Sequence, residues 1–167
     1  EKIVTRTGRT TSLSYDLYNQ LTSVTGPFGH TITLTANSVT APDGRVYAYA
    51  YDTSNNLASV TYPDGKVRQY LYENVDFPHA LTGIIDEKGV RFATFAYDAD
   101  GKAISTEHAG GVEKTTIAHN ADGSFSVTDA LGRKYTTTLT NQFGLIKPTS
   151  ITGACADCDA KAYTYDA

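Results

Sequence analysis

The chain has 167 residues, with 14 Lys and Arg against 18 Asp and Glu and a formal net charge of −4 at pH 7. This length is enough for one domain with a core or for a stack of smaller units. The mildly acidic balance, without a basic cluster, argues against binding to a phosphate backbone, so no nucleic acid is expected as a partner.

Thr and Tyr, which suit the pleated surface of a sheet, are abundant; the chain has 12 Tyr but no Met and no Trp. No apolar run approaches the roughly 18 residues that a membrane-spanning helix needs, and no signal peptide is recognisable. The chain starts at Glu1 rather than Met, and its last residues, 165–167, resemble the start of another repeat copy. We therefore interpret it as a fragment of a longer protein, without a membrane span.

A repeat runs through the whole chain. Tyr-Asp pairs recur, and a glycine lies fourteen residues after each of the first three of these tyrosines. Weaker copies fill the gaps between the clear ones. We interpret residues 1–167 as one repeat array whose units start near Tyr15, Asn37, Tyr51, Tyr72, Tyr97, His119, Thr140 and Tyr165.

Each unit is expected to contain two turns. Four residues after the start stand residue types that tolerate a left-handed backbone. A later glycine column has the same character and follows Pro-Asp at residues 63–65. The first column is Asn19, Asn55, Asp76, Gly101, Gly123 and Gly144, and the second is Gly29, Gly65, Gly111, Gly132 and Gly153.

Strand-like segments lie between the turns, for example residues 45–51 and 67–72, where Tyr recurs with a period of two. No segment favours a helix. We predict an all-β fold, an antiparallel repeat ribbon of β-hairpins that strand twist curls into an open spiral or partial shell. An apolar column six residues after the start is expected to form one buried face; it comprises Leu21, Leu57, Ala103, Phe125 and Ile146.

The Tyr-Asp pairs have a structural interpretation and a functional one. The aspartate can accept backbone N–H bonds and fix a turn, which explains it without catalysis. The tyrosines suit cross-strand packing, with the hydroxyl in contact with water at the edge of the sheet. A row of exposed tyrosines could instead stack on sugar rings. In the second case Tyr51, Tyr72 and Tyr97 would contact a glycan or a partner protein.

The residues show no pattern of a catalytic or metal centre. None of the four histidines has a second ligand type at zinc-like spacing or a nucleophile arranged as a triad. His119 stands in the tyrosine column, so a packing role is expected for it. Residues 98–101 supply only a fragment of a calcium loop. We expect no enzyme activity, no cofactor and no metal.

Cys155 and Cys158 form the one cysteine pair of the chain. A redox dithiol would normally start a helix in an α/β setting, which this sequence does not offer. Three interpretations stay open: a disulfide that clips a small loop, two free thiols, or half of a zinc site. We favour the disulfide.

The segment from Tyr51 to Tyr72 has the pattern Tyr-Asp-x-x-Asn-x-Leu, then Val-Thr-x-Pro-Asp-Gly, then Tyr-x-Tyr. This pattern resembles the YD repeat of the rearrangement-hotspot (Rhs) family, and the likeness covers nearly the whole chain. It is imperfect over residues 37–44 and from Thr140 onward, where Thr140-Asn141 replaces Tyr-Asp. The family includes polymorphic toxins, insecticidal toxin complex components, wall-associated proteins and animal teneurins.

The resemblance implies a large β-sheet spiral wound into a hollow shell, which commonly encloses a C-terminal toxin. The acidic self-cleaving segment found in toxin-bearing members has no counterpart here. The leading hypothesis is thus a structural encapsulation module, whose partners are a toxin or cargo of the same parent chain and the neighbouring repeats. The alternative is a cell-surface module that binds a glycan or a protein. Either implies a secreted or cell-surface protein, and open sheet edges near Leu13 and Tyr165 predict self-association.

Overall fold

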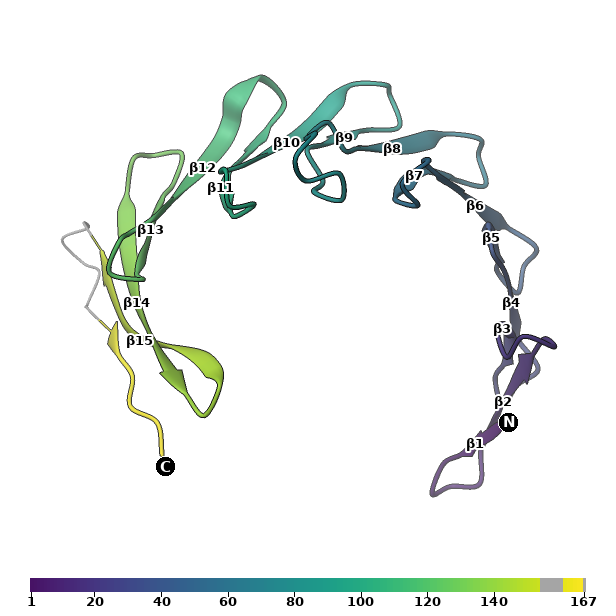
Figure 1. Cartoon of the computed structure of the whole chain (residues 1–167). Helices are drawn as coiled ribbons and strands as arrows, with labels where there is room; N and C mark the ends of the chain where they lie inside the picture. Colours follow the sequence, from purple (N-terminus) through teal and green to yellow (C-terminus); the bar gives the residue numbers. More distant parts are fainter. Residues whose placement is uncertain (154–160, 167) are drawn as a thin grey trace. The chain divides into compact units, whose positions relative to one another are not determined.

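The computed structural model describes residues 1–153 and 161–166 of the chain. This part contains 16 β-strands and one short 3-10 helix, η1 (Ala109–Gly111). The predicted fold class, an all-β antiparallel ribbon of hairpins, is confirmed (Figure 1). Cys155 and Cys158, for which we favoured a disulfide, lie outside the described residues.

The chain divides into two compact units, of which the first comprises Glu1–Tyr70 and Asp86–Gly89. Except for the last, each strand of this unit pairs antiparallel with the strand that follows it in the sequence. The turn Asp86–Gly89 is tied to this unit by an ion pair of 2.9 Å between Arg68 and Glu87. The strands are β1 (Lys2–Val4), β2 (Thr10–Tyr15), β3 (Leu21–Thr25), β4 (Thr31–Thr35), β5 (Ser38–Thr40), β6 (Val46–Tyr51), β7 (Leu57–Thr61) and β8 (Val67–Leu71).

The second unit comprises Leu71–Ile85 and Val90–Ala167. Its strands also pair antiparallel in sequence order, so this unit too is a ribbon of hairpins. The longest hairpin joins β14 to β15. The strands are β9 (Gly83–Ile85), β10 (Arg91–Tyr97), β11 (Ala103–His108), β12 (Val112–His119), β13 (Phe125–Thr128), β14 (Lys134–Gln142), β15 (Leu145–Gly153) and β16 (Lys161–Ala162).

Most hairpins use the same five-residue turn. In the turn at residues 52–56, the N–H of Asp52 donates to the Asn56 carbonyl at 2.9 Å, and the N–H of Asn55 donates to the Asp52 carbonyl at 3.0 Å. This is a type I turn closed by one left-handed residue, here Asn55 with φ 62°. The left-handed backbone is confirmed at Asn19, Asn55, Gly101, Gly123, Gly144, Gly29, Gly65, Gly111 and Gly132.

Two predicted turn positions are wrong. Asp76 is not among the left-handed residues of the described part. The Asn74 side chain instead accepts the backbone N–H groups of Asp76 at 3.0 Å and Phe77 at 3.1 Å, because inserted residues make this connection a loop. Gly153 does not form a turn: it is the last residue of β15 and pairs with Tyr135 of β14.

The expected buried face is also wrong. Ala103 is exposed and Ile146 is 64% exposed, although Leu21, Leu57 and Phe125 are half-buried. Among the described residues, Ala93 is the one buried apolar residue. The reason is architectural: each unit is a single layer of strands, and a layer needs a second layer to bury a whole face.

The N-terminal sheet edge lies elsewhere than expected. We placed it near Leu13, but β2, which contains this residue, pairs with both β1 and β3. The edge strand of the first unit is β1, where Ile3 and Val4 are exposed. Pairing of β1 with another chain stays a prediction.

Candidate functional site

Aspartate side chains hold the turns on both margins of the ribbon. Asp98 Oδ1 accepts the backbone N–H groups of Asp100 at 3.0 Å and Lys102 at 2.9 Å, and the bond from Lys102 lowers the pKa of Asp98. Asp16 and Asp52 accept two N–H groups in the same way. The aspartates of the first three Tyr-Asp pairs thus fix turns, as their sequence positions indicated.

Three members of the tyrosine column contact a backbone carbonyl that lies sixteen or seventeen residues earlier in the chain. The Tyr97 hydroxyl donates to the carbonyl of Leu81, sixteen residues earlier, at 2.8 Å, and the Tyr165 hydroxyl donates to the Pro148 carbonyl at 2.6 Å. His119 replaces tyrosine in its unit, and its Nε2 lies 3.0 Å from the carbonyl of Ala103, again sixteen residues earlier. These three side chains therefore add hydrogen-bond contacts outside the backbone ladder.

The three tyrosines proposed to contact a glycan have different surroundings. Tyr51 ends β6 and is 48% exposed. Tyr72 follows β8 and is half-buried, and Tyr97 ends β10 with its hydroxyl bonded to Leu81. The hydroxyl of Tyr97 is therefore bonded within the chain. Binding of a glycan by this set stays a prediction.

The irregular connection between β8 and β9 is held by a polar cluster that the sequence did not reveal. Arg91 on β10 binds both carboxylate oxygens of Glu73, at 3.2 and 2.8 Å, and its Nη2 also donates to the Thr82 carbonyl at 3.1 Å. The Thr82 hydroxyl lies 3.0 Å from the Glu73 carboxylate. The Arg91 guanidinium fits here because residue 83 is glycine: a Cβ on Gly83 would lie 2.6 Å from it. This cluster thus holds the connection in which the sequence predicted a turn at Asp76.

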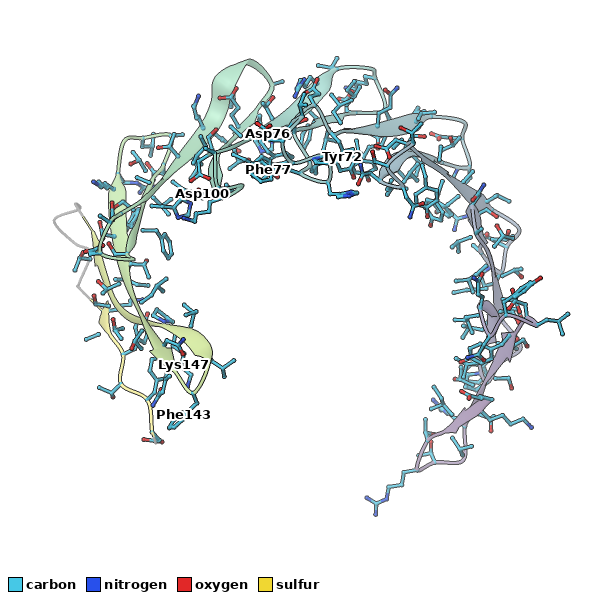
Figure 2. All side chains as sticks on the ribbon, viewed as in Figure 1. Tyr72, Asp76, Phe77, Asp100, Phe143 and Lys147 are labelled. Carbon is cyan, nitrogen blue, oxygen red and sulfur yellow. The ribbon has the colours of Figure 1, made fainter. Side chains whose placement is uncertain are left out.

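Phe77, from the same loop, packs on the turn at residues 98–102. A Cβ built on Gly101 would lie 2.9 Å from its ring, so the ring can lie there because residue 101 is glycine. Figure 2 shows Phe77 beside Asp76 in this loop, with Asp100 in the neighbouring turn. Gly101 therefore meets two demands, a left-handed backbone and a close aromatic contact.

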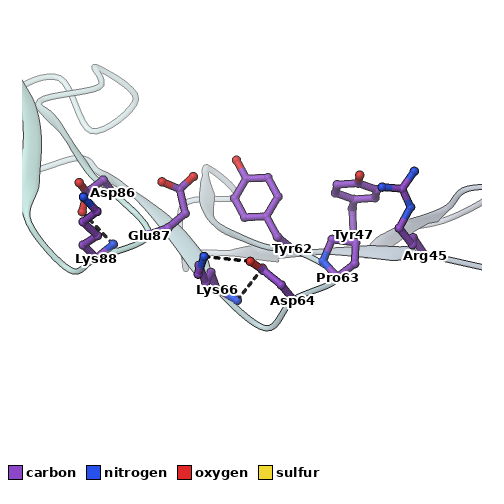
Figure 3. Close-up of a pocket in the computed structure, with 9 residues that line it drawn as sticks. All are labelled: Arg45, Tyr47, Tyr62, Pro63, Asp64, Lys66, Asp86, Glu87 and Lys88. Carbon is purple, nitrogen blue, oxygen red and sulfur yellow. Dashed lines mark hydrogen bonds and ion pairs between the residues drawn. The ribbon is translucent and has the colours of Figure 1, made fainter.

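An open pocket of about 570 Å³ lies on the first unit. Tyr47 on β6 and Tyr62 at the end of β7 form its aromatic part, with ring centroids 6.1 Å apart and planes at 81°. Figure 3 shows Arg45 at one end of the pocket, and Glu87 and Lys88 beyond Tyr62 at the other. The sequence analysis missed this pocket, because it depends on the register that places β6 against β7.

Charges around the pocket are largely paired. Lys66 contacts Asp64 at 3.2 Å, and Arg68 contacts Glu87 at 2.9 Å. Partial desolvation raises the pKa of Tyr62, and the adjacent Glu87 carboxylate adds to this while Arg68 opposes it. The pocket thus offers aromatic surface and hydrogen-bonding groups without an excess of either charge.

The His108 side chain, on the second unit, lies between two acceptors. His108 Nδ1 lies 3.4 Å from the Phe92 carbonyl, and its Nε2 lies 3.4 Å from the Glu113 carboxylate. Across residues 1–153 and 161–166, no three His, Cys, Asp or Glu side chains gather closely enough to hold a metal ion. In the same part of the chain, no helix has the length and apolar character to cross a membrane.

Comparison with known proteins supports the sequence resemblance. Residues 38–67 match the family described as RHS Repeat, which confirms the resemblance on this segment. No curated protein sequence matches the chain.

The fold is shared with crystal structures named TcdB2-TccC3-Cdc42 and TcdB2-TccC3-TEV. The chain is 16% and 14% identical to them, with TM-scores of 0.59 and 0.61, and 93% of it is covered in each case. A third structure, TcdB2-TccC3 without its hypervariable C-terminal region, matches 89% of the chain at 16% identity and a TM-score of 0.59. The chain spans only 9% of the length of each of these chains.

Proposed function

We propose that this chain, whose residues 38–67 form an RHS repeat, is a segment of the wall of a β-shell that encloses a toxin or other cargo of the same parent protein. The observation that carries this proposal is the fold shared with the TcdB2-TccC3 structures over 93% of the chain. The role is steric: the wall separates its contents from solvent. The neighbouring repeats would be its first partners, and secretion or surface display would be its setting.

The single-layer architecture supports this role. A wall needs to be thin and continuous, and every strand from β1 to β8, and again from β9 to β16, is bonded to the next by backbone hydrogen bonds. Short hairpins close at a small cost in loop entropy, so the wall is built from local contacts.

The absence of a buried face also fits a wall. Ala93 is the one buried apolar residue in the described part, so neither unit forms a core of its own. A globular binding domain would stabilise itself through such a core. A ribbon of this kind is instead stabilised by its ladder, its turns and whatever lies along its faces.

Limited proteolysis of the full reading frame that contains this segment tests the proposal. The region that follows the repeats should survive a protease dose that digests the same region expressed alone. Disruption of the wall by Gly101→Val and Gly123→Val together should remove the protection, whereas Asn55→Gly should keep it. Equal digestion of the downstream region with and without the repeats would contradict encapsulation.

A further inference from the structure

The tip of the longest hairpin carries an aromatic residue in an unfavourable backbone conformation. Gln142 pairs with Leu145, so Phe143 and Gly144 are the two residues of the loop between β14 and β15. Their φ values are 54° and 81°. Asn-Gly and Asp-Gly are the pairs that favour such a loop, whereas a bulky residue is strained in it. Because backbone strain is concentrated at functional sites, Phe143 is a candidate for a role beyond forming the turn.

Exposed apolar side chains gather at this tip. Phe143 is 81% exposed, Leu145 62% and Ile146 64%. Figure 2 shows Phe143 at the end of the hairpin. The Asn141 side chain accepts the N–H of Gly144 at 3.0 Å, so the turn is held without any help from the aromatic ring. Adjacent exposed apolar residues of this kind mark an interaction site.

The hairpin that carries this tip has no acidic residue. Residues 134–153 include Lys134 and Lys147 but neither aspartate nor glutamate, in a chain whose net charge is −4. Lys147 lies close to the tip, since its Nζ donates to Gln142 Oε1 at 3.3 Å and stands 4.6 Å from the centre of the Tyr165 ring. The tip therefore suits a surface that combines aromatic rings with carboxylates.

The pocket on the first unit has this chemistry. Tyr47 and Tyr62 meet edge to face at 81°, so their rings form a corner against which a third ring can pack. The carboxylates of Asp64, Asp86 and Glu87 line the same pocket and offset its basic residues, and the hairpin brings no acidic group to oppose them. The volume of about 570 Å³ is ample for one phenyl side chain.

We infer that Phe143 of one molecule inserts between Tyr47 and Tyr62 of a second copy of this chain. The contact is heterologous: each molecule keeps a free tip or a free pocket, so association continues from copy to copy. One contact of this kind accounts for both surfaces, whereas a lipid bilayer would account for the tip alone. The contact uses neither the β1 edge nor an enclosed cargo, and its small area makes it a weak one.

The chain contains no tryptophan, so Phe143→Trp places one fluorescent reporter at the tip. A trace of this 167-residue variant, titrated with the parent chain up to about 1 mM, should show a saturable blue shift as the indole leaves water. With Tyr62→Ala as the titrant, binding should weaken by about tenfold or more. Leu131→Trp, at a turn position that is 79% exposed, is the matched control and should not shift. No shift, or an equal shift with folded Tyr62→Ala, would overturn the proposal.

Mixing two variants tests which surface meets which. Phe143→Asn keeps the pocket and Tyr62→Ala keeps the tip, so an equimolar mixture should form a dimer, seen by light scattering, that neither variant forms alone. Asparagine tolerates a left-handed backbone, so Phe143→Asn should remain folded. If Tyr62→Ala unfolds, Tyr47→Ala takes its place.

Association through the β1 edge would be equal in all these variants, so it cannot produce the complementation. A mixture that behaves as its two components do alone would overturn the proposal. A blue shift of Phe143→Trp with phosphatidylcholine vesicles but none with the parent chain would overturn it as well, in favour of a membrane.

Discussion

His119 Nε2 lies 3.0 Å from the carbonyl oxygen of Ala103, in the same relation in which the Tyr97 hydroxyl bonds the carbonyl of Leu81. The two side chains differ in chemistry, but each places a polar atom against a backbone carbonyl sixteen residues earlier in the chain. With a proton on Nε2, the imidazole donates as the phenol does. At these two positions the column therefore supplies a polar atom to a backbone carbonyl sixteen residues earlier, and not an aromatic ring alone.

Removal of this donor should weaken the ribbon. Tyr97→Phe keeps the ring but loses the hydroxyl, so the free energy of unfolding should fall by about 0.5 to 1.5 kcal/mol. His119→Tyr should preserve stability because it restores the donor of the other units, whereas His119→Phe should lower it. Urea unfolding followed by circular dichroism measures all three. Equal stability of the parent and Tyr97→Phe would show that the bond contributes nothing.

The turn at residues 98–102 should tolerate substitution less well than its counterpart at 120–124. Gly101 and Gly123 have φ values of 77° and 81°, so alanine at either position should cost about 1 to 2 kcal/mol. Only at Gly101 would the new Cβ also meet the Phe77 ring, which should add about 1 to 3 kcal/mol.

A second substitution separates the two contributions. In a Phe77→Ala background, Gly101→Ala should cost only as much as Gly123→Ala does in the parent chain. Asn55→Gly is the neutral control, since glycine also adopts a left-handed backbone. Chemical denaturation measures the free energy of unfolding of each variant. If Gly101→Ala and Gly123→Ala lower it equally in the parent chain, Phe77 does not have the role assigned to it.

The cluster around Arg91 should behave as one interaction. Glu73→Gln removes the charge, and Gly83→Ala forces the guanidinium to move, so each should break the bidentate contact and lower the free energy of unfolding by about 1 kcal/mol or less, because the pair is partly exposed. The double variant should cost little more than either single one. Full additivity in a thermodynamic cycle would mean that Glu73 and Gly83 act independently.

Acid should weaken the turns through their carboxylates. Hydrogen bonds from the Lys102 backbone lower the pKa of Asp98, and those from Ser124 lower the pKa of Asp122. A carboxyl whose pKa is lower in the folded chain contributes stability above its unfolded pKa of about 3.9, and this contribution is lost as the pH falls through the folded pKa. Stability should therefore decrease from about pH 5 downward.

Asparagine variants provide the control for this acid effect. Asp98→Asn keeps an oxygen acceptor for the backbone N–H groups but cannot titrate, so stability should depend less on pH between about 5 and 2 than in the parent chain. Denaturant melts across this range provide the comparison. If the parent chain were equally stable at about pH 5 and about pH 2, the role of the carboxylates would be contradicted.

The turns were predictable from the sequence, whereas the contacts between turns were not. A left-handed backbone, as at Asn55 and Gly123, restricts which residue types can occupy the position. A column of Asn and Gly in the sequence therefore predicts it. Asp76 fitted the same column, but it lies in an inserted loop. The ion pair of Glu73 and Arg91 stabilises that loop, where the sequence predicted a turn. No local pattern marks that cluster, since its partners are eighteen residues apart.

The burial pattern and the pocket escaped prediction for a related reason. An apolar column predicts a buried face only if a second layer covers it, and in this chain Ile146 remains 64% exposed. Tyr47 and Tyr62 become neighbours through the register of two strands, which depends on turn lengths. Sequence reasoning therefore reached the fold and the turns but not the surfaces.

The account is tested most directly by a cryo-electron microscopy map of the full reading frame that contains this chain. We predict that β1–β16 form one stretch of a continuous curved wall, with density for another part of the same chain on its inner side. A map in which these strands pack against a second layer of sheet or helices, and enclose nothing, would contradict the proposal.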